Sequence, residues 1–242
     1  MAQIGFKTDK GKSRVANEDA LFVMPKQNIF ILADGVGGHN AGEVASRTTV
    51  KFIADYIQEN QIHPNLIQAD IKNYFSKCMN LANSTIFDLA NEPNYKNGMA
   101  TTAVVLYIHK NIANIINVGD SRAYLIRNDE IHQITEDHTI VNQLIKDGKL
   151  KKEEAEAHPL SNMITKAVGA EDGIAPDFYS FEIKKKDIIM LCSDGLYNEV
   201  SDKEILELIS RGATMHQTCK SLIDKANENQ GKDNITVICV KI

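Results

Sequence analysis

Four aspartates lie at the ends of apolar runs of the kind that form buried strands. They are Asp34, Asp120, Asp194 and Asp233, in the segments 28–35, 114–120, 187–195 and 233–240. One Asp-Gly pair after a strand is also a common turn signal, but four such strand ends favour carboxylates that share one cleft. Gathering them away from water costs several kcal/mol per charge. Hard divalent cations with oxygen ligands are the natural compensation, so the pattern predicts a metal site.

Six short motifs follow one another along the chain. In order they are Arg14-x-x-Asn17-Glu18-Asp19, Asp34-Gly35-Val36-Gly37-Gly38-His39, Thr101-Thr102, Gly119-Asp120-Ser121-Arg122, Ser193-Asp194-Gly195 and Asp233-Asn234. As an ordered set they resemble the metal-dependent serine/threonine protein phosphatases, the PPM or type 2C-like family, and in particular its short bacterial members. The resemblance runs from about Gly5 to Val240, and each motif alone is a weak signal.

Length and composition fit one folded unit. A chain of 242 residues with 43% hydrophobic content can bury one sizeable core, so we expect a single catalytic domain over 1–242. The irregular segment 137–170 interrupts the strand order, as an inserted functional loop does, and it resembles the family's flap. The net charge of −5 offers no basic patch for nucleic acid. The lysine run 184–186 is interpreted as an exposed hairpin.

Cysteine usage and hydropathy bear on the compartment. The four cysteines are scattered among apolar residues without a Cys-x-x-Cys motif, which is typical of reduced core thiols in a cytoplasmic protein. No apolar stretch approaches the ~20 residues of a membrane span, and the N-terminus lacks the apolar segment of a signal peptide. We therefore expect a cytoplasmic protein with no membrane partner.

The hydrophobic periodicity predicts an α+β fold. We expect strands near 2–8, 20–24, 28–33, 100–108, 111–118, 121–127, 177–183, 187–192 and 234–241, and helices near 41–59, 64–91, 201–210 and 214–228. Hairpin strands together with pairs of long helices favour a four-layer sandwich, in which two antiparallel β-sheets are flanked by pairs of antiparallel helices. The family resemblance implies the same architecture, with a metal cleft at one end.

The resemblance also implies a ligand set for two Mn²⁺ or Mg²⁺ ions and a third. Asp34 is expected to bridge two cations, which a carboxylate with two oxygens can do. The other expected ligands are Gly35 through its backbone carbonyl, Asp194 and Asp233 at the first metal, Glu18 through water at the second, Asp19 orienting bound waters, and Asp120 with Asp194 at the third. Solvated turn residues remain the alternative for Glu18 and Asp19, and a turn cap remains the alternative for Asp120.

Two further residues are candidates for catalysis. Arg14 is assigned to the substrate phosphate, because a planar guanidinium can bind two phosphate oxygens; a surface ion pair with Glu18 is the alternative. Eukaryotic members of the family often have a histidine directly after Asp-Gly, where this chain has Val36. His39 is the nearest candidate for a general acid, with a structural hydrogen-bonding role as the alternative.

The resemblance implies hydrolysis of phosphoserine and phosphothreonine in proteins, by direct attack of a metal-activated water at a binuclear centre. Its expected partners are phosphorylated proteins and a cognate serine/threonine kinase, and the expected oligomeric state is a monomer. A dinucleotide-binding loop is a competing interpretation of Gly35-Val36-Gly37, but Asn40 replaces its third glycine. A non-catalytic relative that binds phosphoproteins is another, which the intact Asp34 and Arg14 oppose.

Overall fold

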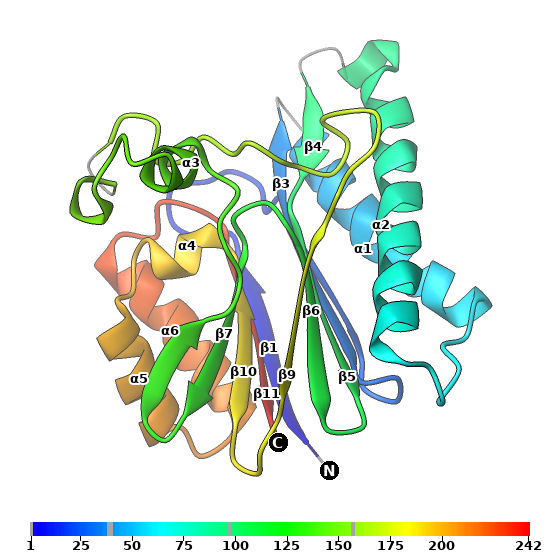
Figure 1. Ribbon diagram of the computed structural model, residues 1–242. Coiled ribbons are helices and arrows are strands. Elements are labelled where there is room, and N and C mark those ends of the chain that lie inside the picture. Colours follow the sequence, from blue (N-terminus) through cyan, green and yellow to red (C-terminus); the bar gives the residue numbers. More distant parts are fainter. Residues whose placement is uncertain (1, 38–40, 96–97, 156–157) are drawn as a thin grey trace.

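Two antiparallel sheets form the centre of the molecule in the computed structural model, which describes residues 2–37, 41–95, 98–155 and 158–242 (Figure 1). The first sheet has the order β1-β11-β10-β7-β8. It comprises β1 (Gln3–Asp9), β7 (Arg122–Arg127), β8 (Glu130–Gln133), β10 (Ile188–Cys192) and β11 (Ile235–Lys241). The second has the order β2-β3-β5-β6-β9, and β4 pairs with β3. It comprises β2 (Asp19–Met24), β3 (Ile29–Gly37), β4 (Met99–Thr101), β5 (Ala103–His109), β6 (Ile112–Val118) and β9 (Asp177–Glu182).

Helices cover the outer face of each sheet. The second sheet packs against α1 (Ala41–Glu59) and α2 (Gln68–Ala90), and the first against α5 (Asp202–Arg211) and α6 (Met215–Asn229). The shorter elements are η1 (Pro93–Tyr95), α3 (Ile140–Lys146), η2 (Lys152–Glu154) and α4 (Asp194–Tyr197). Three apolar clusters fill the spaces between these layers. The predicted four-layer α+β sandwich is confirmed.

Burial on both faces explains why the strands read as continuous apolar runs. In β3, Ile29 and Ile31 face the cluster under α1 and α2, whereas Phe30 and Leu32 face the space between the sheets. Side chains alternate between the two faces of a strand, so a strand covered on both sides needs apolar residues at every position. The run ends where Asp34 reaches the edge of the sandwich. This edge lies far from both chain termini, which Figure 1 shows at the opposite end.

Several predicted boundaries differ from the structure. The second helix begins at Gln68 and not near residue 64, and the strand expected at 100–108 is interrupted at Thr102. The lysine run 184–186 is exposed, as expected, but it is not a hairpin, because β9 and β10 belong to different sheets. The short elements β8 and α4 were not predicted. Four residues are too few to show a periodicity.

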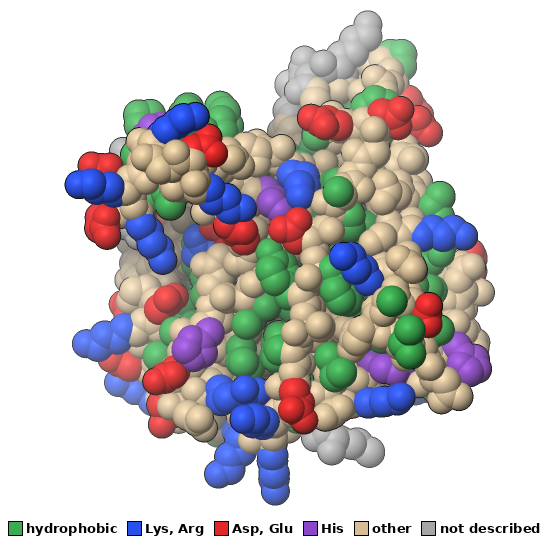
Figure 2. All heavy atoms as spheres, viewed as in Figure 1, with side chains coloured by type: hydrophobic (Ala, Val, Ile, Leu, Met, Phe, Trp, Pro, Cys, Tyr) green, Lys and Arg blue, Asp and Glu red, His purple; other side chains and the backbone are tan. Residues whose placement is uncertain are grey.

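The segment 137–170, called the flap segment below, contains α3 and η2 and lies beside α4 at the same end of the sandwich as β4 (Figure 1). In Figure 2, acidic and basic side chains and a histidine gather where the flap segment meets the rest of the molecule. The four cysteines are free and buried, as expected for reduced core thiols. No helix in the described ranges has the length and apolarity to cross a membrane.

Candidate active site

The backbone of Asp34 is fixed by two threonines of the neighbouring chain segment. Thr102 donates its backbone N–H to the carbonyl oxygen of Asp34 at 2.8 Å, and its hydroxyl accepts from the Asp34 N–H at 2.9 Å. The hydroxyl of Thr101 donates to the same Asp34 carbonyl at 2.8 Å. Because Thr102 turns toward Asp34, it leaves the regular ladder and separates β4 from β5. The backbone of Asp34 is therefore fixed within β3, which continues past the predicted end at residue 33 to Gly37.

Asp19 lies directly opposite Asp34 in the antiparallel pair of β2 and β3. Its Oδ2 accepts from the hydroxyls of Ser193 at 2.8 Å and Thr236 at 2.6 Å, which come from the other sheet. Its Oδ1 is buried and has no hydrogen-bond partner. An orphaned carboxylate oxygen at a site of this kind points to a missing partner, either a water or a cation.

Asp194 and Asp233 come from adjacent strands of the first sheet. Asp194 follows β10 as the first residue of α4, and Asp233 precedes β11. The Nδ2 of Asn198 donates to Asp194 Oδ2 at 3.2 Å. Asp233 Oδ1 accepts from the backbone N–H of Asn234 at 2.7 Å. The two carboxylates thus stand at the same end of the sandwich as Asp34.

Asn234 holds the loop that carries Arg14 and Glu18. Its Nδ2 donates to the carbonyls of Lys10 and Ala16 at 2.9 Å each, and its Oδ1 accepts from the backbone N–H of Glu18 at 2.7 Å.

Close backbone contact fixes Gly35, since a Cβ built there would stand 2.0 Å from the carbonyl oxygen of Gly42. Only glycine fits at this position between the site and α1.

The carboxylates raise one another's pKa. Burial, followed by the charges of Asp19 and Asp194, raises the pKa of Asp34 well above its ordinary value. Burial also raises the pKa of Asp19, of Asp194 and of Glu18. These shifts have two causes, desolvation of the charged form and repulsion between like charges, and a bound cation would relieve both.

The donor set fits hard divalent cations. As the side chains stand, no group of three or more His, Cys, Asp or Glu residues within the described ranges is arranged to hold a metal ion. The oxygen-only ligands, the orphaned Asp19 Oδ1 and the raised pKa values nevertheless suit Mn²⁺ or Mg²⁺.

Arg14 contacts Asp233 and not Glu18, the alternative partner that the sequence suggested. Its Nη2 donates to Asp233 Oδ2 at 2.7 Å, and the Arg14 side chain is 49% exposed. An exposed ion pair of this kind contributes about 0–1 kcal/mol, so a phosphate can displace it at little cost. Arg14 therefore lies beside Asp233, one of the predicted metal ligands, with about half of its side chain exposed.

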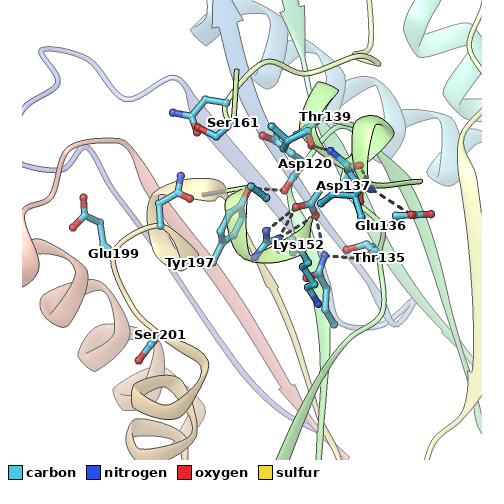
Figure 3. Close-up of a pocket in the computed structure, with 18 of the residues that line it drawn as sticks. Asp120, Thr135, Glu136, Asp137, Thr139, Lys152, Ser161, Tyr197, Glu199 and Ser201 are labelled. Carbon is cyan, nitrogen blue, oxygen red and sulfur yellow. Dashed lines mark hydrogen bonds and ion pairs between the residues drawn. The ribbon is translucent and has the colours of Figure 1, made fainter. Parts of the chain in front are cut away.

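Asp120 lies beyond this group, in a cavity of about 860 Å³ between the flap segment and the α4–α5 connection (Figure 3). Of the predicted site residues that the structure describes, Asp120 alone lines this cavity. Burial, then the charges of Asp194 and Asp137, raises the pKa of Asp120 to about 7. The remaining predicted residue, His39, lies outside the described residues.

Sequence reasoning missed the hydroxyl groups that hold the acids, above all Ser193 and Thr236, and gave Thr101 and Thr102 no function. Ser193 directly precedes Asp194, and Thr236 follows Asp233 by three positions, but the partner of both, Asp19, lies on β2. Only the cross-sheet arrangement brings Asp19 to Ser193 and Thr236. Thr102 also contacts Ser121 through a 2.7 Å hydroxyl pair, which ties the Asp34 and Asp120 segments together.

Comparisons with known proteins agree with this geometry. The family model described as protein phosphatase 2C matches residues 10–230. The serine/threonine phosphatase stp of Listeria innocua is 38% identical over 239 residues, covering 98% of this chain and 94% of that protein. The crystal structure of the serine/threonine phosphatase Stp1 from Staphylococcus aureus superposes with a TM-score of 0.92 at 36% identity, covering 100% of this chain and 95% of that one.

A second solved structure contains metal. It is the catalytic domain of the serine/threonine protein phosphatase PstP in complex with two manganese ions. It matches with a TM-score of 0.85 at 31% identity, covering 99% of this chain and 97% of that one.

Proposed function

The chain belongs to the protein phosphatase 2C family, and we propose that the cleft around Asp34, Asp194 and Asp233 is where it hydrolyses phosphoserine and phosphothreonine in proteins. It is a metal-dependent serine/threonine phosphatase, like the relatives that match it over nearly their whole length. The observation that carries the site assignment is the convergence of acids from both sheets at one end of the sandwich, where each raises the pKa of its neighbours.

The acidic side chains would hold two Mn²⁺ or Mg²⁺ ions. Asp34, whose backbone is fixed by Thr101 and Thr102, would be the ligand that both cations share, because a carboxylate has two oxygens. Further ligands are the Gly35 carbonyl, Asp194 and Asp233, with Glu18 and Asp19 acting through water and Asp120 contributing to a third site. When bound, the cations supply Lewis acidity, which makes water a stronger acid and neutralises charge on phosphoryl oxygens.

The remaining residues position the substrate and the acids. Arg14 leaves Asp233 and donates two hydrogen bonds to the phosphate, where its permanent charge balances the transferred group. Ser193 and Thr236 hold Asp19 in one orientation through its Oδ2, which leaves the buried Oδ1 available to a bound water. Asn234 keeps the Arg14 loop against the cleft. His39 stays our candidate for protonating the leaving oxygen.

The domain organisation and cellular context are further proposals. Residues 1–242 form one catalytic domain with a flap at 137–170, and its substrates are phosphoproteins that include a cognate serine/threonine kinase. The four buried free cysteines support a reducing, cytoplasmic location. The proposed oligomeric state is a monomer, with a mass of 26.9 kDa. Light scattering on the purified protein distinguishes this monomer from a dimer.

Phosphate release from a phosphothreonine peptide tests the proposed function. We expect turnover with Mn²⁺, none after treatment with a chelator, and recovery when Mn²⁺ is added back. A phosphotyrosine peptide of the same sequence is the control for substrate class. Turnover that survives complete metal removal would contradict the assignment.

A further inference from the structure

Val15 is an apolar side chain that lies almost entirely in solvent. It keeps 95% of its accessible surface, more than any other large hydrophobic residue in the described ranges. It belongs to none of the three apolar clusters. Single exposed apolar residues are common on protein surfaces, but this one directly follows Arg14, the residue assigned to the substrate phosphate. Its position beside Arg14 therefore matters more than its exposure.

Hydrogen bonds hold the backbone on both sides of Val15. Before it, Ser13 donates its backbone N–H to the carbonyl of Gly231 at 3.1 Å. After it, the carbonyl of Ala16 accepts from the Nδ2 of Asn234 at 2.9 Å. A valine side chain is branched at Cβ and has few rotamers to lose when another group packs on it. The loop thus presents a fixed apolar surface at a low entropic cost of contact.

Val36 is a second exposed valine near the acidic residues. It keeps 39% of its accessible surface and also lies outside the three apolar clusters. The strand β3 keeps one antiparallel register with β5 and then with β4. Val36, two residues beyond Asp34, is therefore on the same face of the strand as Asp34, about 7 Å further along it. It lies further out along β3 than the Asp34 carboxylate.

The two valines are carried by chain segments that meet beside the acids. The backbone N–H of Gly35 donates to the carbonyl of Glu18 at 3.1 Å, just beyond the paired part of β2 and β3. Val36 follows Gly35 directly, and Val15 precedes Glu18 by three positions. A peptide whose phosphate reaches Arg14 and the acids must therefore pass close to these segments.

We propose that Val15 and Val36 form an apolar subsite for the side chain of a residue within two positions of the phosphorylated serine or threonine. This inference rests on the proposed function and names a class of substrate for it. The phosphate is common to all substrates, so only its neighbours can distinguish them. An apolar neighbour that covers the valines removes apolar surface from water, whereas a polar neighbour loses its own hydration. Substrates with a leucine-like residue there are therefore preferred.

A series of phosphothreonine peptides tests the subsite. In each peptide one of the four positions nearest the phosphothreonine, two on either side, is leucine, glutamine or glutamate, and the remaining sequence is constant. Leucine and glutamine are similar in size, so their comparison isolates polarity. Glutamate reports attraction by Lys10 and Lys12, which are exposed on the same loop as Val15. With Mn²⁺ present, wild-type kcat/KM should be about 5-fold higher for leucine than for glutamine at one position at least, as partial burial of apolar surface predicts.

Matched variants identify the contact. Val15→Thr keeps the branched shape and replaces one methyl group with a hydroxyl, so the preference for leucine should fall to about 2-fold or less. Val15→Lys should reverse the preference, so that the glutamate peptide becomes a better substrate than the leucine peptide. Val36→Thr should weaken the preference in the same way as Val15→Thr. The control is Leu81→Gln, which makes an exposed apolar residue of α2 polar and should leave the preference at its wild-type value.

The subsite is refuted if the wild-type protein hydrolyses leucine and glutamine peptides equally well, or if Val15→Thr and Val36→Thr keep the full preference. An equal loss on every peptide in Val15→Thr also refutes it, because Val15 would then support the Arg14 loop without contacting the substrate. Failure of the proposed function looks different. In that case the wild-type protein releases no phosphate from any peptide of the series with Mn²⁺ present.

Discussion

Replacing Asp120 with asparagine should stabilise the protein when no divalent cation is present. Asp120 is buried, since the residue keeps 8% of its accessible surface. Burial and the charges of Asp194 and Asp137 raise the pKa of its carboxyl from 3.8 to about 7. Above pH 7 the folded protein must keep this group charged in unfavourable surroundings. An amide of nearly the same shape removes that charge.

Proton linkage gives the sign and the size of the change in the free energy of unfolding that Asp120→Asn should cause. Between pH 3.8 and about 7 the folded state binds the proton more tightly than the unfolded state, so the free energy of unfolding falls as pH rises through this window. At about 1.4 kcal/mol per pH unit the full penalty is about 4 kcal/mol. Water in the adjoining cavity screens the charge, so we expect a gain of about 1–2 kcal/mol, which corresponds to roughly 2–8 °C in Tm for a chain of this size.

Thermal unfolding with a chelator present measures this effect. At pH 8 Asp120→Asn should melt above the wild-type protein, and at pH 5 the difference should be clearly smaller, because the folded wild-type carboxyl is then protonated and only the unfolded one is ionised. Asp88→Asn, on the exposed face of α2, is the control and should change stability by less than about 0.5 kcal/mol at either pH. A metal-free Asp120→Asn protein that is no more stable than wild type at pH 8 would refute the reasoning.

Three further predictions concern catalysis. Asp194→Asn and Asp233→Asn should each abolish nearly all turnover while the protein stays folded, because an amide keeps the shape but not the charge that holds a cation; circular dichroism and phosphate release check this. Arg14→Ala should raise KM about 10-fold or more, as expected for the loss of charged hydrogen bonds of roughly 1.5–3 kcal/mol each, and inhibition by inorganic phosphate should weaken in parallel. Lys151→Ala or Lys152→Ala in the flap segment should change kcat/KM among phosphopeptides but not for a small aryl phosphate; equal losses on all substrates would mean that the segment serves the core.

The layered fold could be predicted from the sequence because the patterns that indicate its helices and strands are local. The helix at 41–59 was predicted at its observed bounds, since apolar residues recur there at helical spacing. The break at Thr102 was not predictable in this way. It depends on hydrogen bonds to Asp34, 68 residues away in sequence, and a local pattern carries no record of such a partner.

The same limit applies to the site. The strand-end aspartates could be identified because each ends or begins an apolar run. Their partners could not, since the Arg14–Asp233 pair spans 219 residues and the Thr236–Asp19 bond spans 217. The contact of Tyr197 with Arg122 was equally hidden, because the two residues lie far apart in the sequence.

Counting bound Mn²⁺ in the wild-type protein and in Asp34→Asn tests the metal cleft most directly. The wild-type protein should bind at least two Mn²⁺ per chain, and Asp34→Asn should lose tight binding with its fold retained, because Asp34 is the proposed bridging ligand. Phosphate release from the same samples should fall together with occupancy. If Asp34→Asn bound the same number of Mn²⁺ ions with the same affinity as wild type, the cleft would have been assigned to the wrong residues.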